Sequence, residues 1–150
     1  MPTPEMSDAT TKGVRVGATA YYLPEESDPE SNKYLFGYTI VVANTGEAPV
    51  RLVSRHWVII DGKGNREEVQ GPGVVGKTPR LEPGQAFKYQ SFCPLPTPWG
   101  TMEGTYQMER DDGETFDANI GRFYLAVPRE SEQKPERKPA RPNAGRKPRG

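Results

Sequence analysis

The chain has 150 residues, with 20 basic and 20 acidic side chains, 16 glycines, 16 prolines, one cysteine and one histidine. This length suits a single domain, and so many glycines and prolines argue against a helical bundle. One cysteine cannot form an internal disulfide, one Cys and one His cannot build a zinc cluster, and no apolar run is long enough to cross a membrane. The first twelve residues lack the apolar core of a signal peptide, so we expect a cytoplasmic protein with no membrane partner.

The two ends of the chain differ in composition from its middle. Residues 1–12 combine prolines with small polar residues, and we expect them to be disordered. Residues 128–150, called here the basic tail, contain eight Lys/Arg against three Glu, five prolines and no Val, Ile, Leu, Met or aromatic residue. Such a segment cannot bury enough apolar surface to offset the entropy of ordering, so it is also expected to be disordered. Residues 13–127 are then one folded domain with a single core.

Within residues 13–127 the apolar residues alternate with polar ones, which is the pattern of half-buried strands. A break in the alternation between Leu52 and Trp57 predicts a bulge near Arg55. Prolines at 94, 96 and 98 exclude residues 93–99 from any central strand. With no amphipathic helix in the sequence, we predict an all-β, antiparallel β-sandwich of seven to eight strands. In chain order the expected strands are residues 14–20, 34–42, 50–60, 66–70, 85–92, 105–110, 115–120 and 123–127.

The segment Gly71–Thr78 reads Gly-Pro-Gly-Val-Val-Gly-Lys-Thr and matches both the dinucleotide fingerprint and the Walker A pattern. Both motifs work only where a helix begins at the phosphate. Pro79 pushes Thr78 away from helical angles, so we interpret the glycines as permitting a tight turn. Successive backbone N–H groups of such a turn could still form a nest for an anion. The candidate ligand-binding residues are Gly71, Gly73, Val74, Val75, Gly76 and Lys77.

The segment Ser54-Arg55-His56-Trp57 contains the only histidine. Ser54 and His56 would point the same way on a regular strand. No nearby strand residue is an obvious acid to orient the ring, although Asp61 could do so in three dimensions. We therefore expect Trp57 to anchor the core, Arg55 and His56 to make surface or edge hydrogen bonds, and neither to be catalytic.

Residues 111–114 and Cys93 contain groups that could bind a metal or react, but we interpret both as structural. Residues 111–114, Asp-Asp-Gly-Glu, lack the ligand spacing of a calcium loop and are expected to form a hairpin turn. Cys93 precedes a proline, and nothing near it in sequence would lower its thiol pKa. No catalytic residue, metal ligand or cofactor is predicted.

Several short segments occur in a characteristic order: Tyr38-Thr39-Ile40, Ser54-Arg55-His56-Trp57, Gly73-Val74-Val75-Gly76, Leu81-Glu82-Pro83-Gly84 and Thr97–Gly104. Together they resemble the ApaG family, also called DUF525, over about residues 10–128. The resemblance implies a fibronectin type III-like or immunoglobulin-like sandwich that acts as a binding module, and a link to cobalt and magnesium homeostasis. Pro72, Lys77 and Thr78 depart from the family pattern, so the Walker match is particular to this chain.

The leading hypothesis is therefore a non-catalytic interaction module. It would present the Gly71–Gly76 loop and neighbouring strands to a partner protein or to an anionic, nucleoside polyphosphate-like ligand. The first alternative is an enzyme or sensor that acts on nucleoside polyphosphates through Gly71–Thr78. The second is direct cobalt or magnesium binding by surface carboxylates. The basic tail, which has no aromatics, either only solubilises the domain or contacts a polyanion through phosphates in a salt-dependent manner.

Overall fold

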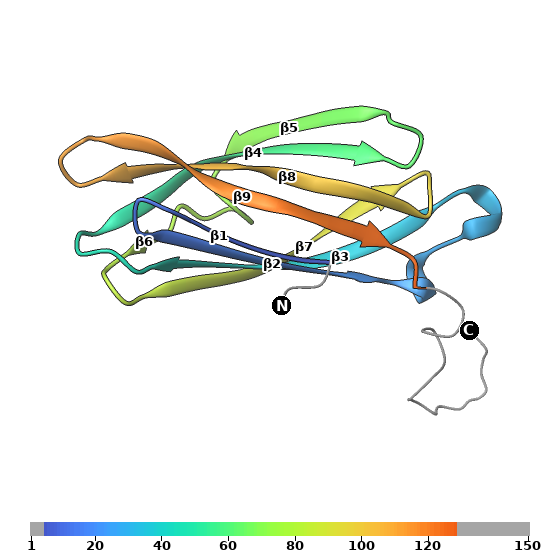
Figure 1. The fold of residues 1–150 in the computed structure, drawn as a ribbon, viewed down its shortest axis with the longest axis horizontal. Helices are drawn as coiled ribbons and strands as arrows, with labels where there is room; N and C mark the ends of the chain where they lie inside the picture. The colour runs from blue at the N-terminus through green and yellow to red at the C-terminus, as the bar shows by residue number, and fades with distance from the viewer. Residues whose placement is uncertain (1–4, 129–150) are drawn as a thin grey trace, which may run out of the picture.

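The computed structural model describes residues 5–128 as two antiparallel β-sheets packed face to face (Figure 1). The first sheet has the order β1 (Met6–Thr11), β2 (Val14–Tyr22), β3 (Tyr34–Asn44), β7 (Ala86–Leu95). The second has the order β5 (Arg66–Pro72), β4 (Val50–Asp61), β8 (Trp99–Arg110), β9 (Thr115–Ala126), and the short β6 (Arg80–Leu81) also pairs with β4. Two 3-10 turns, η1 (Pro24–Glu26) and η2 (Pro29–Ser31), lie between β2 and β3. The predicted all-β sandwich is confirmed.

The alternation of apolar residues fills the space between the two sheets. On β2 and β3 every second residue from Val14 to Ala20 and from Phe36 to Val42 is buried. Trp57 of β4 lies at the centre of an aromatic cluster, with ring centroids 5.5 Å from Tyr38, 6.3 Å from Tyr106 and 6.0 Å from Phe123. The cluster therefore joins strands of both sheets, as edge-to-face aromatic contacts commonly do in cores.

Two bulges set which side chains face outward from the second sheet. On β4 the register with β8 shifts between Leu52 and Ser54, so the bulge falls at Val53, two residues before the predicted position. A second shift, opposite β8 residues Met102 to Gly104, keeps β9 continuous where the sequence predicted two strands. The first bulge turns Ser54 outward, while Arg55 lies opposite the buried Tyr106 on the inner side.

The N-terminal segment corrects one prediction. Residues 1–12 were expected to be disordered, but Met6–Thr11 forms β1, which pairs with β2 in antiparallel register. This strand needs little apolar surface because it lies at a sheet edge and half of its residues face outward. Residues 1–4 and 129–150 lie outside the described part, so the expectation for the basic tail is not addressed by the structure.

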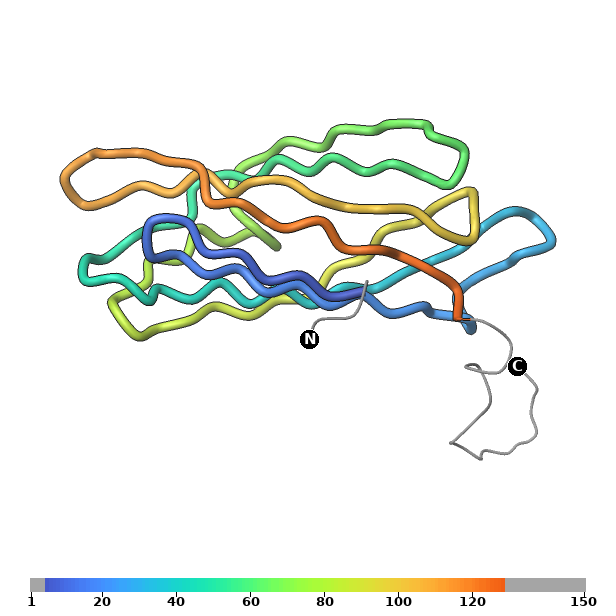
Figure 2. Tube along the Cα trace, in the orientation of Figure 1, coloured from blue at the N-terminus to red at the C-terminus, as the bar shows by residue number. Residues whose placement is uncertain are grey.

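Strands β5 and β6 both pair with β4, so the connection between them starts and ends beside that strand (Figure 2). Strand β7 extends through Pro94 to Leu95, which a proline permits because β7 is an edge strand.

Within residues 5–128, no helix is long and apolar enough to span a membrane.

Candidate functional site

The segment Gly71–Thr78 forms a tight turn between two strands, called here the glycine turn. Val74 and Lys77 exchange two backbone hydrogen bonds of 2.8 Å, and Val75 and Gly76 between them have φ of +43° and +79°. Positive φ at both central positions is the geometry of a type I′ turn. The chain therefore runs strand, turn, strand, and in this part of the protein no helix follows Lys77 to receive a phosphate.

Three amides of the glycine turn already have protein acceptors. The Gly73 N–H donates to the Val53 carbonyl over 2.8 Å, and those of Val74 and Lys77 donate to each other's carbonyls. An anion nest needs successive N–H groups that point into one empty concavity. These three donors are used within the turn and the sheet, so only the remaining amides of the turn could face an anionic ligand.

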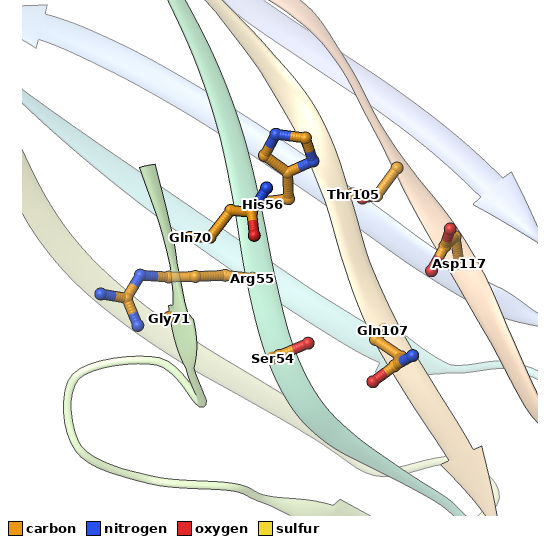
Figure 3. Close-up of a pocket in the computed structure, with 8 residues that line it drawn as sticks. All are labelled: Ser54, Arg55, His56, Gln70, Gly71, Thr105, Gln107 and Asp117. Atoms are coloured by element: carbon orange, nitrogen blue, oxygen red, sulfur yellow. The ribbon is translucent and has the colours of Figure 1, made fainter. Parts of the chain in front are cut away.

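Arg55 holds the base of the glycine turn. Its Nη1 donates to the carbonyls of Pro72 and Gly73, each over 3.0 Å. The guanidinium passes beside Gly71, where an added Cβ would lie 3.0 Å from Nη2. Figure 3 shows the Arg55 side chain directed across Gly71, away from the other labelled residues. Gly71 is therefore needed for the close approach of this side chain, and Arg55 fixes the turn relative to β4.

A polar hollow of about 390 Å³ lies next to the glycine turn, over β4, β5, β8 and β9 (Figure 3). The register pairs Ser54 with Gln107, and Gln107 with Asp117, so these three side chains share the outer face of the sheet. The hollow offers hydroxyls, amides and one carboxylate at short spacing, which suits hydrogen bonding to a polar surface. Its lining residues are Ser54, Arg55, His56, Gln70, Gly71, Thr105, Gln107 and Asp117.

His56 belongs to a surface charge network beside the hollow. Its Nε2 lies 2.8 Å from Glu68 Oε1, and Glu68 Oε2 accepts a 2.8 Å hydrogen bond from Arg66 Nη2. His56 first, and Arg66 second, hold the pKa of Glu68 below its usual range by stabilising the charged carboxylate. The predicted surface hydrogen bonds of Arg55 and His56 are thus present, although the acceptor of Arg55 is backbone.

The acid proposed to orient His56 lies elsewhere. Asp61 ends β4, and its Oδ1 accepts hydrogen bonds from the backbone N–H of Lys63 over 2.8 Å and of Asn65 over 3.0 Å. Asp61 therefore caps a hairpin. Within residues 5–128 the structure gives no hydrogen bond between Ser54 and His56, so these residues are not assembled as a nucleophile and base.

The other candidates are structural in this fold. Trp57 is 2% exposed and belongs to the core, as predicted. Cys93 is buried, and burial raises the pKa of its thiol to about 12, which disfavours a reactive thiolate. Residues 111–114 form the predicted hairpin turn between β8 and β9, with Gly113 at φ +94°. The described residues contain no group of three or more His, Cys, Asp or Glu placed to hold a metal.

Sequence reasoning missed four residues of the hollow: Gln70, Thr105, Gln107 and Asp117. Each is an ordinary polar residue at an outward strand position, where sequence alone gives no distinguishing pattern. Only the pairing register brings them to the Ser54-Arg55-His56 segment. A correct register would have found them, but a single sequence does not determine it.

Fold and site together define an antiparallel β-sandwich domain in which a turn held by Arg55 borders a polar sheet face. The ApaG domain model matches residues 24–110. Protein ApaG of Anaeromyxobacter dehalogenans strain 2CP-C is 55% identical over 123 residues, covering 82% of this chain and 97% of that protein. Protein ApaG of Aromatoleum aromaticum is 52% identical over 124 residues, covering 83% and 98%.

A solved structure is also similar to this chain over most of its length. The crystal structure of the putative ApaA protein from Bordetella pertussis superposes with a TM-score of 0.76 at 45% identity, covering 85% of this chain and 99% of that one. This chain belongs to the ApaG domain family.

Proposed function

We propose that the protein is a non-catalytic module that binds a partner protein through the glycine turn and the adjoining polar hollow. One observation is the main support: Val75 is 51% exposed at the tip of the turn and has a φ of +43°. A β-branched residue at positive φ is strained, by about 1–3 kcal/mol. Strained positions of this kind concentrate at binding sites, where the geometry serves recognition.

The geometry of the turn favours a protein partner over an anionic ligand. Several of its amides donate within the fold, while its tip offers an apolar side chain on a turn whose base Arg55 holds. An exposed apolar side chain on a rigid turn fits an apolar pocket, because little conformational entropy is lost on binding. Gly71 belongs to both the turn and the hollow, so the hydroxyls and amides of the hollow supply a polar rim to the same interface.

The test replaces the apolar tip without disturbing the turn. Val75→Asn keeps a residue type that tolerates positive φ and removes the apolar side chain. The full chain is tagged, proteins that it captures from its own cells are identified, and the affinity of each purified candidate is measured by calorimetry. The matched control is Tyr124→Ser, which removes an exposed side chain from β9, away from the hollow and from the first sheet.

We expect a protein that binds the wild type and Tyr124→Ser equally and binds Val75→Asn at least tenfold more weakly. Such a loss corresponds to about 1.4 kcal/mol, which is typical of a buried apolar contact. Equal binding of every captured protein by Val75→Asn and the wild type would reject the glycine turn as the interface.

A further inference from the structure

The outer face of the first sheet exposes several large apolar side chains that no other part of the described chain covers. One exposed large apolar side chain lies on each of its four strands: Met6 at 43%, Tyr21 at 37%, Val41 at 37% and Phe92 at 61% exposure. These are four of the seven such residues in the described part of the chain. Exposed apolar patches of this kind mark interaction sites.

The charges on this face have a particular arrangement. The strand register places Asp8, Gly17, Val41 and Lys88 in one row across β1, β2, β3 and β7. An acid therefore lies at one edge of the sheet and a base at the other edge, with a glycine and a valine between them. Asp8 also pairs with Arg15 of β2.

This row is complementary to itself under a two-fold rotation. If a second copy faces the first across an axis parallel to the strands, β1 lies over β7 of the copy and β2 lies over β3. Asp8 then opposes Lys88, and Gly17 opposes Val41, twice over. Symmetric dimers require such self-complementarity, because the same patch contacts itself.

The middle of the row has a matching shape. A Cβ added at Gly17 would meet no atom within 4 Å, so the sheet is open above this residue. Gly17 also lines a hollow of about 370 Å³, together with Met6 and Val41 among others. The exposed Val41 of a second copy therefore has a space to enter, as stacked sheets require when their side chains interdigitate about 10 Å apart.

We propose that the outer face of the first sheet is a homodimer interface, occupied by a second copy of this chain. Four strands about 4.8 Å apart and about nine residues long give a flat footprint of roughly 570 Å². Stable interfaces bury at least about 600 Å² of accessible surface on each partner, and side-chain relief raises the accessible area above the flat footprint. This interface is separate from the glycine turn, so it stands or fails independently of the proposed function.

Sedimentation velocity of the full chain over a concentration series tests the proposal. The wild type is expected to dimerise. Gly17→Glu fills the open space and buries an unpaired charge between the copies, so we expect the dimer dissociation constant to rise at least about a hundredfold. A Cβ at Gly17 meets no atom within 4 Å, and the new carboxylate faces Asp8 across the strand pair, so at a dilution where both proteins are monomeric the loss of unfolding free energy should stay below about 1 kcal/mol.

The matched control is Thr105→Glu, an outward β8 position on the second sheet, which should change the dissociation constant less than about threefold. A wild type that is monomeric at every concentration would overturn the proposal. So would a dimer that survives Gly17→Glu or is lost in Thr105→Glu.

A charge exchange tests the orientation. Lys88→Asp places like charges opposite each other twice and should weaken the dimer about tenfold. Adding Asp8→Lys restores opposite charges between the copies, but it also removes the ion pair with Arg15, so Asp8→Lys alone is measured beside it. The two-fold arrangement predicts that the double variant binds more tightly than the two single losses added together would give, and simple addition of the losses would contradict it.

Discussion

Among the turns of the second sheet that have residues at positive φ, residues 111–114 and the glycine turn meet this requirement differently. In the hairpin of residues 111–114 the position is filled by Gly113, and Asp112 Oδ1 accepts the Glu114 N–H over 2.9 Å. In the glycine turn, Gly76 shares the tip with Val75, a residue type that is unfavourable at positive φ. The hairpin thus follows the sequence preferences that favour stability, whereas the glycine turn departs from them at an exposed position. The difference points to recognition in one turn and to chain reversal in the other.

The largest expected difference in stability between the two turns concerns Gly73, at the base of the glycine turn. An added Cβ at Gly73 would lie 2.3 Å from the Lys77 carbonyl oxygen, and its φ is +60°. Gly73→Ala should therefore lower the free energy of unfolding by about 3 kcal/mol or more, through both clash and backbone strain. At Gly113 a Cβ meets nothing within 4 Å, so Gly113→Ala should cost only about 1–2 kcal/mol of backbone strain. Urea unfolding measures both, and equal losses would remove the distinction between the turns.

The arginines that support the two turns should differ next. Arg55 donates to two backbone carbonyls from a half-buried position, so Arg55→Lys should cost about 1–2 kcal/mol because a lysine cannot reproduce the planar donors. Arg80 pairs with Asp111 and Glu82 at the surface, where solvent screens the ion pairs, so Arg80→Lys should cost less stability than Arg55→Lys. Chemical denaturation in parallel checks the order. A larger loss for Arg80→Lys would show that Arg55 is not the main support of the glycine turn.

The smallest expected effect is on the pH dependence of stability. In this comparison it comes from the hairpin of residues 111–114 and not from the glycine turn. Arg80 holds the pKa of Asp111 below its usual range, mainly by hydrogen bonding. Because the folded pKa is lowered, this contribution to stability is present above the unfolded value of about 3.9 and disappears as the pH falls through the folded value. Asp111→Asn should therefore make the loss of stability below about pH 4 slightly shallower. Arg55→Lys should keep the wild-type acid slope, since residues 71–78 contain no carboxylate; a changed slope in that variant would contradict this assignment.

The sequence predicted most of the strands because their alternation is regular, as from Val14 to Ala20 and from Tyr34 to Val42. It did not predict β1, because Met6–Thr11 lacks the apolar alternation that marks a half-buried strand. That strand forms through backbone pairing with β2, a contribution that composition does not show.

The candidate site was predicted less completely. The glycines at 71, 73 and 76 predicted a tight turn, which the structure confirms. Sequence preferences did not indicate a positive φ at Val75. The surrounding fold imposes that conformation on a β-branched residue. The hollow depends on the bulge at Val53, which decides that Ser54 and Gln107 share a face, and a one-residue difference in register would have separated them.

The central claim is that Val75 stays strained because its side chain serves binding, and the unfolding free energy of Val75→Asn tests it most directly. Asparagine is favoured at the first central position of a type I′ turn when glycine follows, as Gly76 does here. The account predicts that Val75→Asn unfolds with a free energy about 0.5–1 kcal/mol higher than the wild type, because strain is relieved and little buried surface is lost. A variant that is equally stable or less stable than the wild type would contradict the account, because Val75 would then be stabilising the fold.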